Sequence, residues 1–216
     1  MNLDSKIFTS AESIERGVVA ARVAITREMQ SISVLESRLI PELDLVLPIL
    51  LACHGKIVIT GLGKSGHIGR KIAATFSSTG SSSFFVHPTE ALHGDSGVLH
   101  DLDVLLAISY SGETQEVCAF SNLVKSWNIP IVALTGNRSS TLALMANAHI
   151  DISVEKEADP LSIAPTSSTT VTLVVGDVLA SALMAAKNFS LEDFALRHPG
   201  GALGAQLLEI SKKESL

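Results

Sequence analysis

The stretch Ile57–Lys71, IVITGLGKSGHIGRK, decides the fold that the chain is expected to adopt. It begins with a β-branched, apolar run, Ile57–Thr60, which is typical of a buried strand. Four glycines follow within nine residues, and apolar residues then recur at helical spacing. These glycines are Gly61, Gly63, Gly66 and Gly69. A strand, a glycine turn and a helix start in this order predict backbone N–H groups free to bind an anion, most often phosphate, at the carboxyl end of a sheet.

The kind of phosphate ligand can be narrowed from the surrounding residues. Residues 61–66 match G-x-G-x-x-G, but the dinucleotide fingerprint also needs an acidic residue about 20 residues further on, at the end of the next strand. Here the next apolar run, 83–86, ends without one, and the nearest acid, Glu90, lies beyond it. In a nucleotide-binding P-loop the first glycine would fall on Val58. We therefore expect a small phosphorylated substrate rather than a nucleotide.

Composition limits the class of protein. The chain has 216 residues, of which 46% are hydrophobic and only 4% aromatic, so we expect one domain with an aliphatic core, as in folds with buried parallel strands. A net charge of −6 without basic runs argues against nucleic acid as a partner. The first 13 residues do not resemble a signal peptide, and the most apolar stretch, Val171–Ala186, contains Asp177 and is expected to be a core helix. We expect a cytoplasmic protein with no membrane partner.

The N-terminal part is predicted to be helical. Residues 10–39 carry one apolar stripe at steps of three and four residues and are expected to form one long helix. A second helix is expected from Pro41 to about Gly55. We interpret residues 1–39 as a helical extension that packs on the single domain formed by residues 1–216, and the stripe could equally contact another subunit.

After residue 55, predicted strands and helices alternate. The expected strands are 57–60, 83–86, 104–109, 131–134 and 150–154. The expected helices are 66–78, 113–126, 140–147, 167–187 and 190–196, with a last one at the end of the chain. This alternation predicts an α/β fold with a doubly wound, Rossmann-like sheet of about five parallel strands flanked by helices.

A second phosphate-binding element is predicted at residues 109–114, SYSGET, between the third strand and the next helix. Its hydroxyl groups, its glycine and the following helix N-terminus can together bind a phosphate group. The alternative is ordinary N-capping of the helix, for which one hydroxyl would be enough. A third hydroxyl cluster, residues 166–169, also opens a helix and by itself is interpreted as a cap.

Together these motifs resemble the SIS (sugar isomerase) domain. The stretches GLGKSGHIGRKIAATFSSTG, FFVHPTEALHGDSG, ISYSGET, IAPTSSTT and DFALRHPGGALG are similar to the arabinose 5-phosphate isomerases of the Kdo pathway, and the likeness covers about residues 40–208. The resemblance implies interconversion of D-ribulose 5-phosphate and D-arabinose 5-phosphate, which supplies Kdo for lipopolysaccharide or capsule. It also implies a homo-oligomer, a tetramer in our expectation. Two features depart from the family: we expect no C-terminal pair of CBS modules, and Asp159 stands where cysteine is usual, a change expected to leave the chemistry intact.

Aldose–ketose isomerisation defines which catalytic groups to look for. The reaction proceeds through an enediolate and requires a base, a group that moves the hydroxyl proton and a positive charge near the developing oxyanion, but no redox cofactor. From the resemblance we expect Glu157 as the base, Glu116 as a second carboxylate, Lys64 near the oxyanion and His198 as the proton-moving group, reaching a neighbouring subunit's site. From the residues alone, Glu157 and Lys64 could be surface charges, Glu116 a helix N-terminal charge, and His198 a helix C-cap.

The expected substrate contacts share small size or a hydroxyl group, apart from a histidine in the HGD motif. They are Gly63, Ser65, His93, Ser109, Ser111, Thr114 and Ser168. His93 also belongs to a group with His87, Glu90 and Asp95, but a six-residue spacing between the two histidines is not a standard zinc pattern. We expect no cofactor and no required metal, and an inhibitory zinc ion at His93 is left open.

Two other functions fit parts of the sequence. A phosphosugar-binding regulator or sensor would use the same hydroxyl loops without catalytic carboxylates. A related SIS isomerase could act on another sugar phosphate, and pocket depth, which the sequence does not reveal, would distinguish it.

Overall fold

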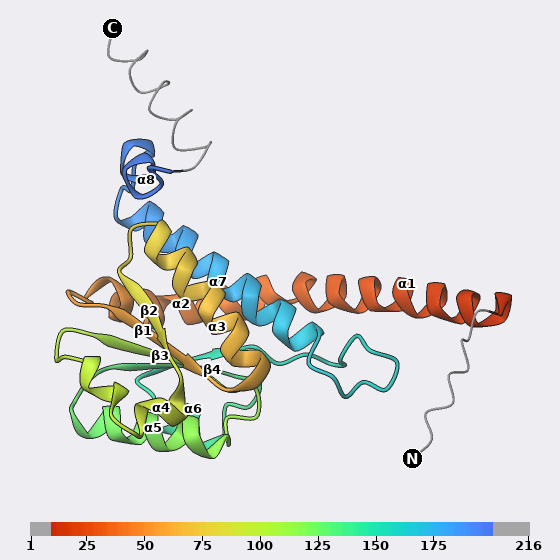
Figure 1. Cartoon of the computed structure of the whole chain (residues 1–216), viewed down its shortest axis with the longest axis horizontal. Coiled ribbons are helices and arrows are strands. Elements are labelled where there is room, and N and C mark those ends of the chain that lie inside the picture. The colour runs from red at the N-terminus through yellow and green to blue at the C-terminus, as the bar shows by residue number, and fades with distance from the viewer. Residues whose placement is uncertain (1–9, 201–216) are drawn as a thin grey trace, which may run out of the picture.

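The computed structural model describes residues 10–200, which form a three-layer α/β domain with a projecting N-terminal helix (Figure 1). Five parallel strands pair in the order β2-β1-β3-β4-β5. Their bounds are β1 Ile57–Gly61, β2 Ser83–Val86, β3 Val104–Ile108, β4 Ile131–Thr135 and β5 Ala148–Asp151. The predicted doubly wound sheet is thereby confirmed.

The three inner strands are buried at every position, because helices cover both faces of the sheet. Successive side chains therefore enter two different cores. Ile57 and Ile59 of β1 pack with one set of helices, whereas Val58 packs with the other. This explains why the strands read as continuous apolar runs in the sequence rather than as alternating ones.

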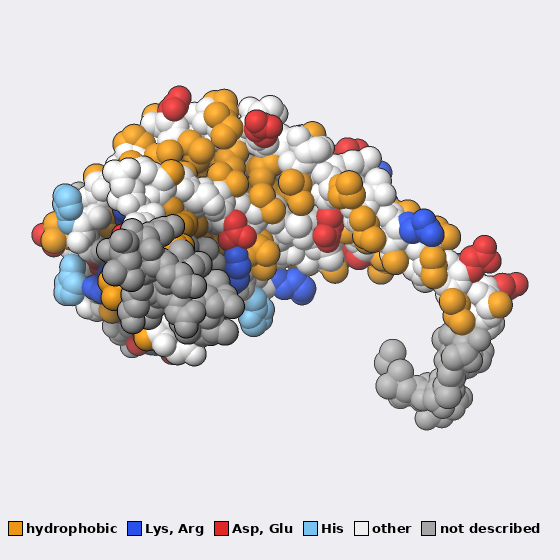
Figure 2. Space-filling view, turned by 90° about the horizontal axis from the view of Figure 1, so that it is seen from above, with side chains coloured by type: hydrophobic (Ala, Val, Ile, Leu, Met, Phe, Trp, Pro, Cys, Tyr) orange, Lys and Arg blue, Asp and Glu red, His pale blue; other side chains and the backbone are white. Residues whose placement is uncertain are grey.

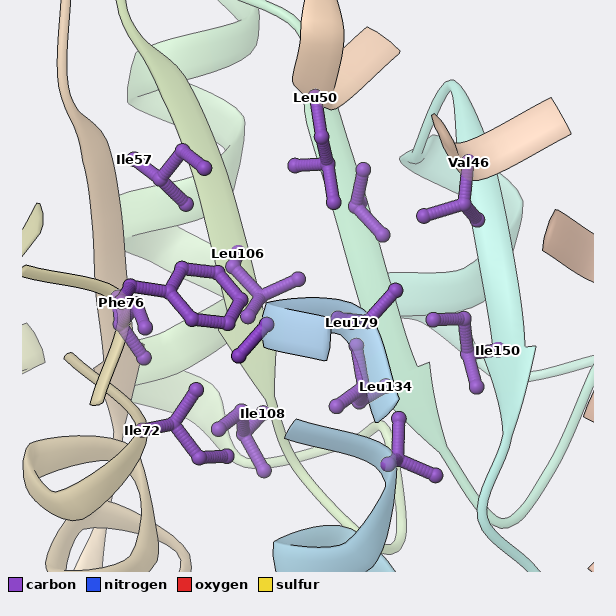
Figure 3. Close-up of a cluster of buried hydrophobic side chains, with 14 of the residues drawn as sticks. Val46, Leu50, Ile57, Ile72, Phe76, Leu106, Ile108, Leu134, Ile150 and Leu179 are labelled. Carbon is purple, nitrogen blue, oxygen red and sulfur yellow. The ribbon is translucent and has the colours of Figure 1, made fainter. Parts of the chain in front are cut away.

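One face of the sheet is covered by α2 (Leu35–Leu51), α3 (Gly63–Ser78) and α7 (Ser167–Ala186). Figure 3 shows this core, in which Phe76 of α3 and Leu179 of α7 meet Leu106 of β3. The opposite face is covered by three shorter helices, with the 3-10 turn Asp95–Val98 beside them. These helices are α4 (Pro88–Ala91), α5 (Gln115–Ser126) and α6 (Thr141–Met145).

Helices α3 and α7 run side by side in the same direction. Gly176 of α7 lies so close to α3 that a Cβ atom there would overlap the Ile72 side chain. Lys71 and Asp177 form an ion pair near the middle of both helices, and Lys187 Nζ donates to Ser81 Oγ (2.9 Å) at their far ends. Since α3 follows directly from β1, the N-termini of both helices lie at the carboxyl edge of the sheet.

The N-terminal helices differ from the prediction of one helix over 10–39 and a second from Pro41. The chain breaks at Val34 into α1 (Ala11–Ser33) and α2, and Pro41 lies inside α2. The break falls where the chain first reaches the core, because Leu35 and Leu39 are buried whereas no residue of α1 is. Thus residues 35–39 pack on the domain, whereas α1 contacts the domain at α7 but buries no residue and projects from it (Figure 1).

The apolar stripe of α1 is exposed. Figure 2 shows hydrophobic side chains along the length of this projecting helix. The stripe residues that are 38–66% exposed are Ile14, Val18, Ile25, Met29 and Ile32. An apolar stripe of this size that its own domain leaves exposed is the kind of surface that other chains cover.

Other boundaries shift by a few residues, and two of the shifts affect the site. Helix α3 starts at Gly63 instead of residue 66, so the glycine loop supplies the first helical turn. Strand β5 ends at Asp151 instead of 154, which leaves residues 152–166 without regular structure. Helix α7 is the one helix within residues 10–200 that is long and apolar enough to cross a membrane, yet its Val175 and Leu179 lie in the core. The helix expected at the end of the chain lies outside the described residues.

Candidate active site at the carboxyl edge of the sheet

The strand order places a crevice between the ends of β1 and β3. These strands are neighbours, with Gly61 paired to Ile108, but the helices that follow them cover opposite faces of the sheet. Such a switch point is where open parallel sheets bind their ligands. The glycine loop, residues 61–66, follows β1, and the serine loop, residues 109–114, follows β3. The two predicted phosphate elements are therefore brought together.

The glycine loop presents the N-terminus of α3 to this crevice. Gly63 adopts φ +57°, a left-handed conformation that glycine accepts without strain. Gly66 packs against the end of β1, since a Cβ atom would lie 2.6 Å from the Gly61 carbonyl oxygen. No side chain among residues 10–200 caps the first N–H groups of α3. Lys64, which is exposed, and Ser65, half-buried, lie on this open turn.

The serine loop is held by its own hydroxyl groups. The hydroxyls of Ser109 and Thr114 are 2.9 Å apart, and Ser109 Oγ also accepts from the Gly112 N–H (3.1 Å). The exposed Ser111 accepts from the Glu113 N–H through Oγ (3.2 Å). Thr114 occupies the N-cap position of α5 but does not cap it with its side chain. The ordinary capping interpretation therefore does not account for these hydroxyls.

Glu116 lies in the first turn of α5, beside the serine loop. It is half-buried and has no hydrogen-bond or ion-pair partner within residues 10–200. Its position agrees both with a second carboxylate in the crevice and with a favourable charge at a helix N-terminus.

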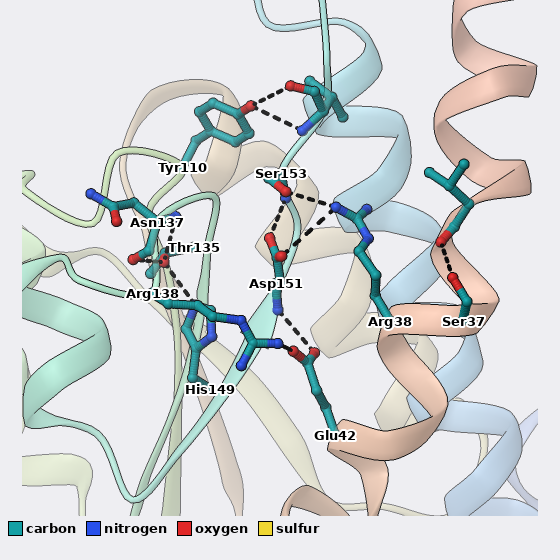
Figure 4. A network of polar contacts seen from close by, with 12 residues as sticks. Ser37, Arg38, Glu42, Tyr110, Thr135, Asn137, Arg138, His149, Asp151 and Ser153 are labelled. Atoms are coloured by element: carbon teal, nitrogen blue, oxygen red, sulfur yellow. Dashed lines mark hydrogen bonds and ion pairs between the residues drawn. The ribbon is translucent and has the colours of Figure 1, made fainter.

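Tyr110 connects the serine loop to the segment that carries Glu157. Its phenolic oxygen accepts from the Val154 N–H (3.1 Å) and donates to the Val154 carbonyl oxygen (3.4 Å), as Figure 4 shows. Gly136, which follows β4, makes room for the ring, because a Cβ atom there would lie 2.9 Å from it. The loops after β3, β4 and β5 are thus joined at the same edge of the sheet.

Glu157 closes the N-terminus of α7. Its Oε2 atom accepts from the Thr166 N–H (2.7 Å), the Thr166 hydroxyl (3.1 Å) and the Ser168 N–H (3.1 Å). Glu157 is therefore not a solvent-facing surface glutamate, because it is half-buried and three donors fix one of its carboxylate oxygens. The other oxygen, Oε1, has no hydrogen-bond partner within residues 10–200. Glu157 therefore caps α7 and keeps one oxygen available.

The hydroxyl cluster at residues 166–169 mainly binds the carboxylate of Glu157. Thr166 Oγ1 also accepts from the Ala158 N–H (2.7 Å), so Thr166 ties the segment to the helix it precedes. Ser168 is buried, and its N–H binds Glu157. Because a carboxylate already occupies the N-terminus of α7, the uncapped N-termini that border the crevice between the glycine and serine loops are those of α3 and α5.

The histidines predicted near the site take different places. His93 is exposed just beyond α4, on the face that α5 also covers. Within residues 10–200, no group of three or more histidine, cysteine, aspartate or glutamate side chains is placed to hold a metal ion, so His87, Glu90, His93 and Asp95 do not form one.

His198 is not brought to Glu157 within one chain. It lies at the C-terminal end of α8 (Leu191–Arg197), where its Nδ1 is 2.8 Å from the Phe194 carbonyl oxygen and its ring stacks on Phe194 at 3.9 Å. The 20 residues of α7 separate this helix from the crevice by about 30 Å (Figure 1). Within its own chain His198 is a helix C-cap, as the alternative interpretation held.

A polar network that sequence reasoning missed supports the same edge of the sheet (Figure 4). The buried Glu42 of α2 accepts from the Asp151 N–H (3.0 Å) and pairs with Arg138, which follows β4. Burial raises the pKa of Glu42 above its ordinary value. Arg38, one turn before Glu42, donates to Ser153 Oγ (2.7 Å). The network fixes the start of segment 152–166, and nothing in the sequence pattern relates residues about 100 positions apart.

Comparison with known proteins agrees with the fold. The family model of the SIS domain matches residues 50–182, and the chain belongs to this family. It is 50% identical over 189 residues to the arabinose 5-phosphate isomerase KdsD of Salmonella typhi, and 51% identical over 189 residues to the arabinose 5-phosphate isomerase GutQ of Escherichia coli (strain K12). Each alignment covers 88% of this chain, and the chain spans 58% and 59% of these relatives' lengths.

A solved structure is also similar over almost the whole of its chain. The protein c3406 of E. coli CFT073, solved in complex with arabinose 5-phosphate, superimposes with a TM-score of 0.82 and 40% sequence identity. The match covers 86% of this chain and 98% of the other.

Proposed function

We propose that the chain is an aldose–ketose isomerase that interconverts D-ribulose 5-phosphate and D-arabinose 5-phosphate through an enediolate. The observation that carries the proposal is a carboxylate, Glu157, fixed at the same edge of the sheet as the hydroxyl-lined serine loop. A phosphate anchor and a base held by one rigid edge are what this reaction requires. The identity to relatives named arabinose 5-phosphate isomerases supports the choice of substrate.

The phosphate group of the substrate is assigned to the crevice between the glycine and serine loops. Its oxygens accept from the uncapped N–H groups of α3 and α5 and from nearby hydroxyls. The residues assigned to substrate binding are Gly63, Ser65, His93, Ser109, Ser111, Thr114 and Ser168. An anchored phosphate holds the two reacting carbons in place while the proton is moved between them.

The catalytic steps are assigned to four residues. Glu157 removes the proton from the carbon next to the carbonyl, through its Oε1 atom, and a proton is then returned to the former carbonyl carbon. Lys64 lies near the enediolate oxygen and stabilises its negative charge. Glu116 is the second carboxylate. His198 of a neighbouring subunit moves the hydroxyl proton, since its own α8 lies about 30 Å from the crevice. No redox cofactor or metal enters these steps.

This assignment requires a homo-oligomer, which we take to be a tetramer. The exposed apolar stripe of α1 is a surface that other subunits can cover. We place the enzyme in the cytoplasm, where it would supply Kdo for lipopolysaccharide or capsule.

Two variants test the roles of the proposed base and the proposed proton-moving group. Glu157→Gln keeps the hydrogen-bonding shape but cannot act as a base, and His198→Ala removes the imidazole. Each is expected to lower the turnover of ribulose 5-phosphate at least about 100-fold while the fold is retained, as circular dichroism would show. Near-native turnover in both variants would contradict the assignment.

Mixing the two variants tests whether His198 acts between subunits. If each site takes Glu157 from one subunit and His198 from another, random reassembly of equal amounts should restore about a quarter of wild-type turnover, because a quarter of the sites receive both intact groups. Activity that stays at the level of the single variants would contradict a shared site.

A further inference from the structure

Within segment 152–166, which carries Glu157, only two apolar side chains, those of Ile152 and Ala158, are buried. It forms no helix or strand, and Leu161 and Ile163 are 76% and 75% exposed. Ser162 adopts φ +53°, a conformation that non-glycine residues rarely take. A segment of this kind depends on polar contacts for its position.

Arg27 of α1 supplies such contacts from a helix that lies outside the catalytic crevice. Its Nη1 atom is 3.1 Å from the Glu157 carbonyl oxygen and 3.2 Å from the Asp159 carbonyl oxygen. The same atom lies 3.3 Å from Ser162 Oγ. One half-buried guanidinium nitrogen is therefore shared by three acceptors of the segment, about 130 positions away in the sequence. Charge-assisted hydrogen bonds of this type are stronger than neutral ones.

The surroundings of Arg27 show how local this contact is. A groove of about 510 Å³ lies between α1 and residues Ala158 and Pro160, and another of about 710 Å³ lies between the end of α1 and residues 153–156. Arg27 lines both grooves. The segment thus stands away from the helix on either side of Arg27 and is held to it at this side chain.

We propose that Arg27 is a positioning residue for the Glu157 carboxylate. It holds the backbone of Glu157 from α1, while the N-terminus of α7 holds the side chain through Oε2. With both ends of the residue fixed, Oε1 keeps one direction relative to the crevice. Within residues 10–200 the Arg27 side chain donates hydrogen bonds only to carbonyl and hydroxyl oxygens of the segment, so it acts through the position of Glu157 and not on the substrate. The catalytic consequence rests on the proposed function.

The test compares Arg27→Met with Arg22→Met. Methionine keeps much of the length of arginine but removes its donors. Arg22 is an exposed arginine on the same helix whose side chain has no partner within residues 10–200, and it provides the matched control. Arg27→Met is expected to lower kcat for ribulose 5-phosphate about 10- to 100-fold, because small misplacements of a catalytic group have effects of this size. KM should change less than about twofold, since the phosphate loops do not contact Arg27.

Hydrogen–deuterium exchange measures the positioning without any reaction. Backbone amides of residues 155–166 should exchange faster in Arg27→Met than in the wild type, and at the wild-type rate in Arg22→Met. Arg27→Lys, which keeps a donor, should fall between the wild type and Arg27→Met in both kcat and exchange. Wild-type kcat in Arg27→Met, or a lowered kcat with unchanged exchange over 155–166, would overturn the proposal.

The two readouts also separate this proposal from the proposed function. If the wild type does not isomerise ribulose 5-phosphate, the proposed function fails, while the exchange comparison still decides whether Arg27 holds the segment. Light scattering of each variant gives its assembly mass. A fall in kcat that follows a change of mass, with unchanged exchange over 155–166, would likewise overturn the positioning role.

Discussion

Replacing Gly112 with alanine should strongly destabilise the protein and disrupt the serine loop. Gly112 adopts φ +69°, where an L-residue is strained, and an added Cβ atom would overlap Oγ and Cβ of Ser140. Ser140 is fully buried and caps α6 by accepting from the Ala143 N–H (3.3 Å). It therefore has no free direction in which to move.

The expected magnitude follows from these contacts. The left-handed conformation costs about 1–2 kcal/mol for a residue with a Cβ atom. Forcing extra volume into a packed site costs about 1–3 kcal/mol, and loss of the Ser140 cap about 1 kcal/mol more. Gly112→Ala should therefore lower the free energy of unfolding by about 3–6 kcal/mol, a large part of the stability of an ordinary domain.

Urea unfolding followed by circular dichroism would measure this loss. Gly97→Ala is the matched control, because a Cβ atom there has nothing within 4 Å and the backbone is not left-handed. In a Ser140→Gly background, which removes the overlapping atoms and keeps an acceptable N-cap residue, the cost of Gly112→Ala should fall to about 1–2 kcal/mol. A cost below about 1 kcal/mol, or one independent of the residue at position 140, would refute the reasoning.

Three further predictions concern polar contacts at the same edge of the sheet. Tyr110→Phe leaves both backbone groups of Val154 without their partner and should cost about 1–3 kcal/mol in urea unfolding; a loss below about 0.5 kcal/mol would contradict the bridge. Burial raises the pKa of Glu42 above its ordinary 4.5, so its ionisation opposes folding. The difference in unfolding free energy should therefore shift in favour of Glu42→Gln as pH rises from 4.5 to the raised folded pKa and then level off, and a difference that is constant across this range would contradict this. At Asp159, burial raises the pKa of the carboxyl group, but hydrogen bonds from the N–H groups of residues 161, 163 and 164 lower this pKa by more. The ionised carboxylate should therefore hold these residues in place fully above pH 3.8, its ordinary pKa, and lose this effect as pH falls through the lower pKa of the folded state. Asp159→Ala should accordingly speed amide exchange at residues 161–164 at neutral pH, and unchanged exchange would contradict this role.

Most of the fold could be predicted because its signals are local. The inner strands are buried on both faces and therefore appear as apolar runs between turn residues. The glycine loop was recognisable because Gly63 and Gly66 are required by the backbone conformation and by close packing. The break at Val34 was not predictable in this way, since it reflects where the chain meets the core and not a local helix signal.

The candidate site could be predicted in its residue types but not in its contacts. Glu157 lies in an acidic run that by itself suggests a solvated surface, and only the fold brings it to N–H groups nine and eleven residues further on. Arg27 reaches the same segment, and Glu42 reaches Asp151 directly before it, from helices more than 100 positions away, so no spacing rule relates them to it. His198 is the opposite case. The sequence motif points to this histidine, but the fold of a single chain does not place it in the crevice.

The most direct test of the proposed activity is a proton NMR time course of ribulose 5-phosphate with the purified wild-type protein treated with a metal chelator. The proposal predicts that anomeric signals of arabinose 5-phosphate grow with time, which would establish the reaction, its stereochemistry and its independence of added metal together. Absence of turnover, both with the chelator and after metal is restored, would contradict the proposal. Calorimetric binding of phosphosugars without turnover would then favour a phosphosugar-binding regulator.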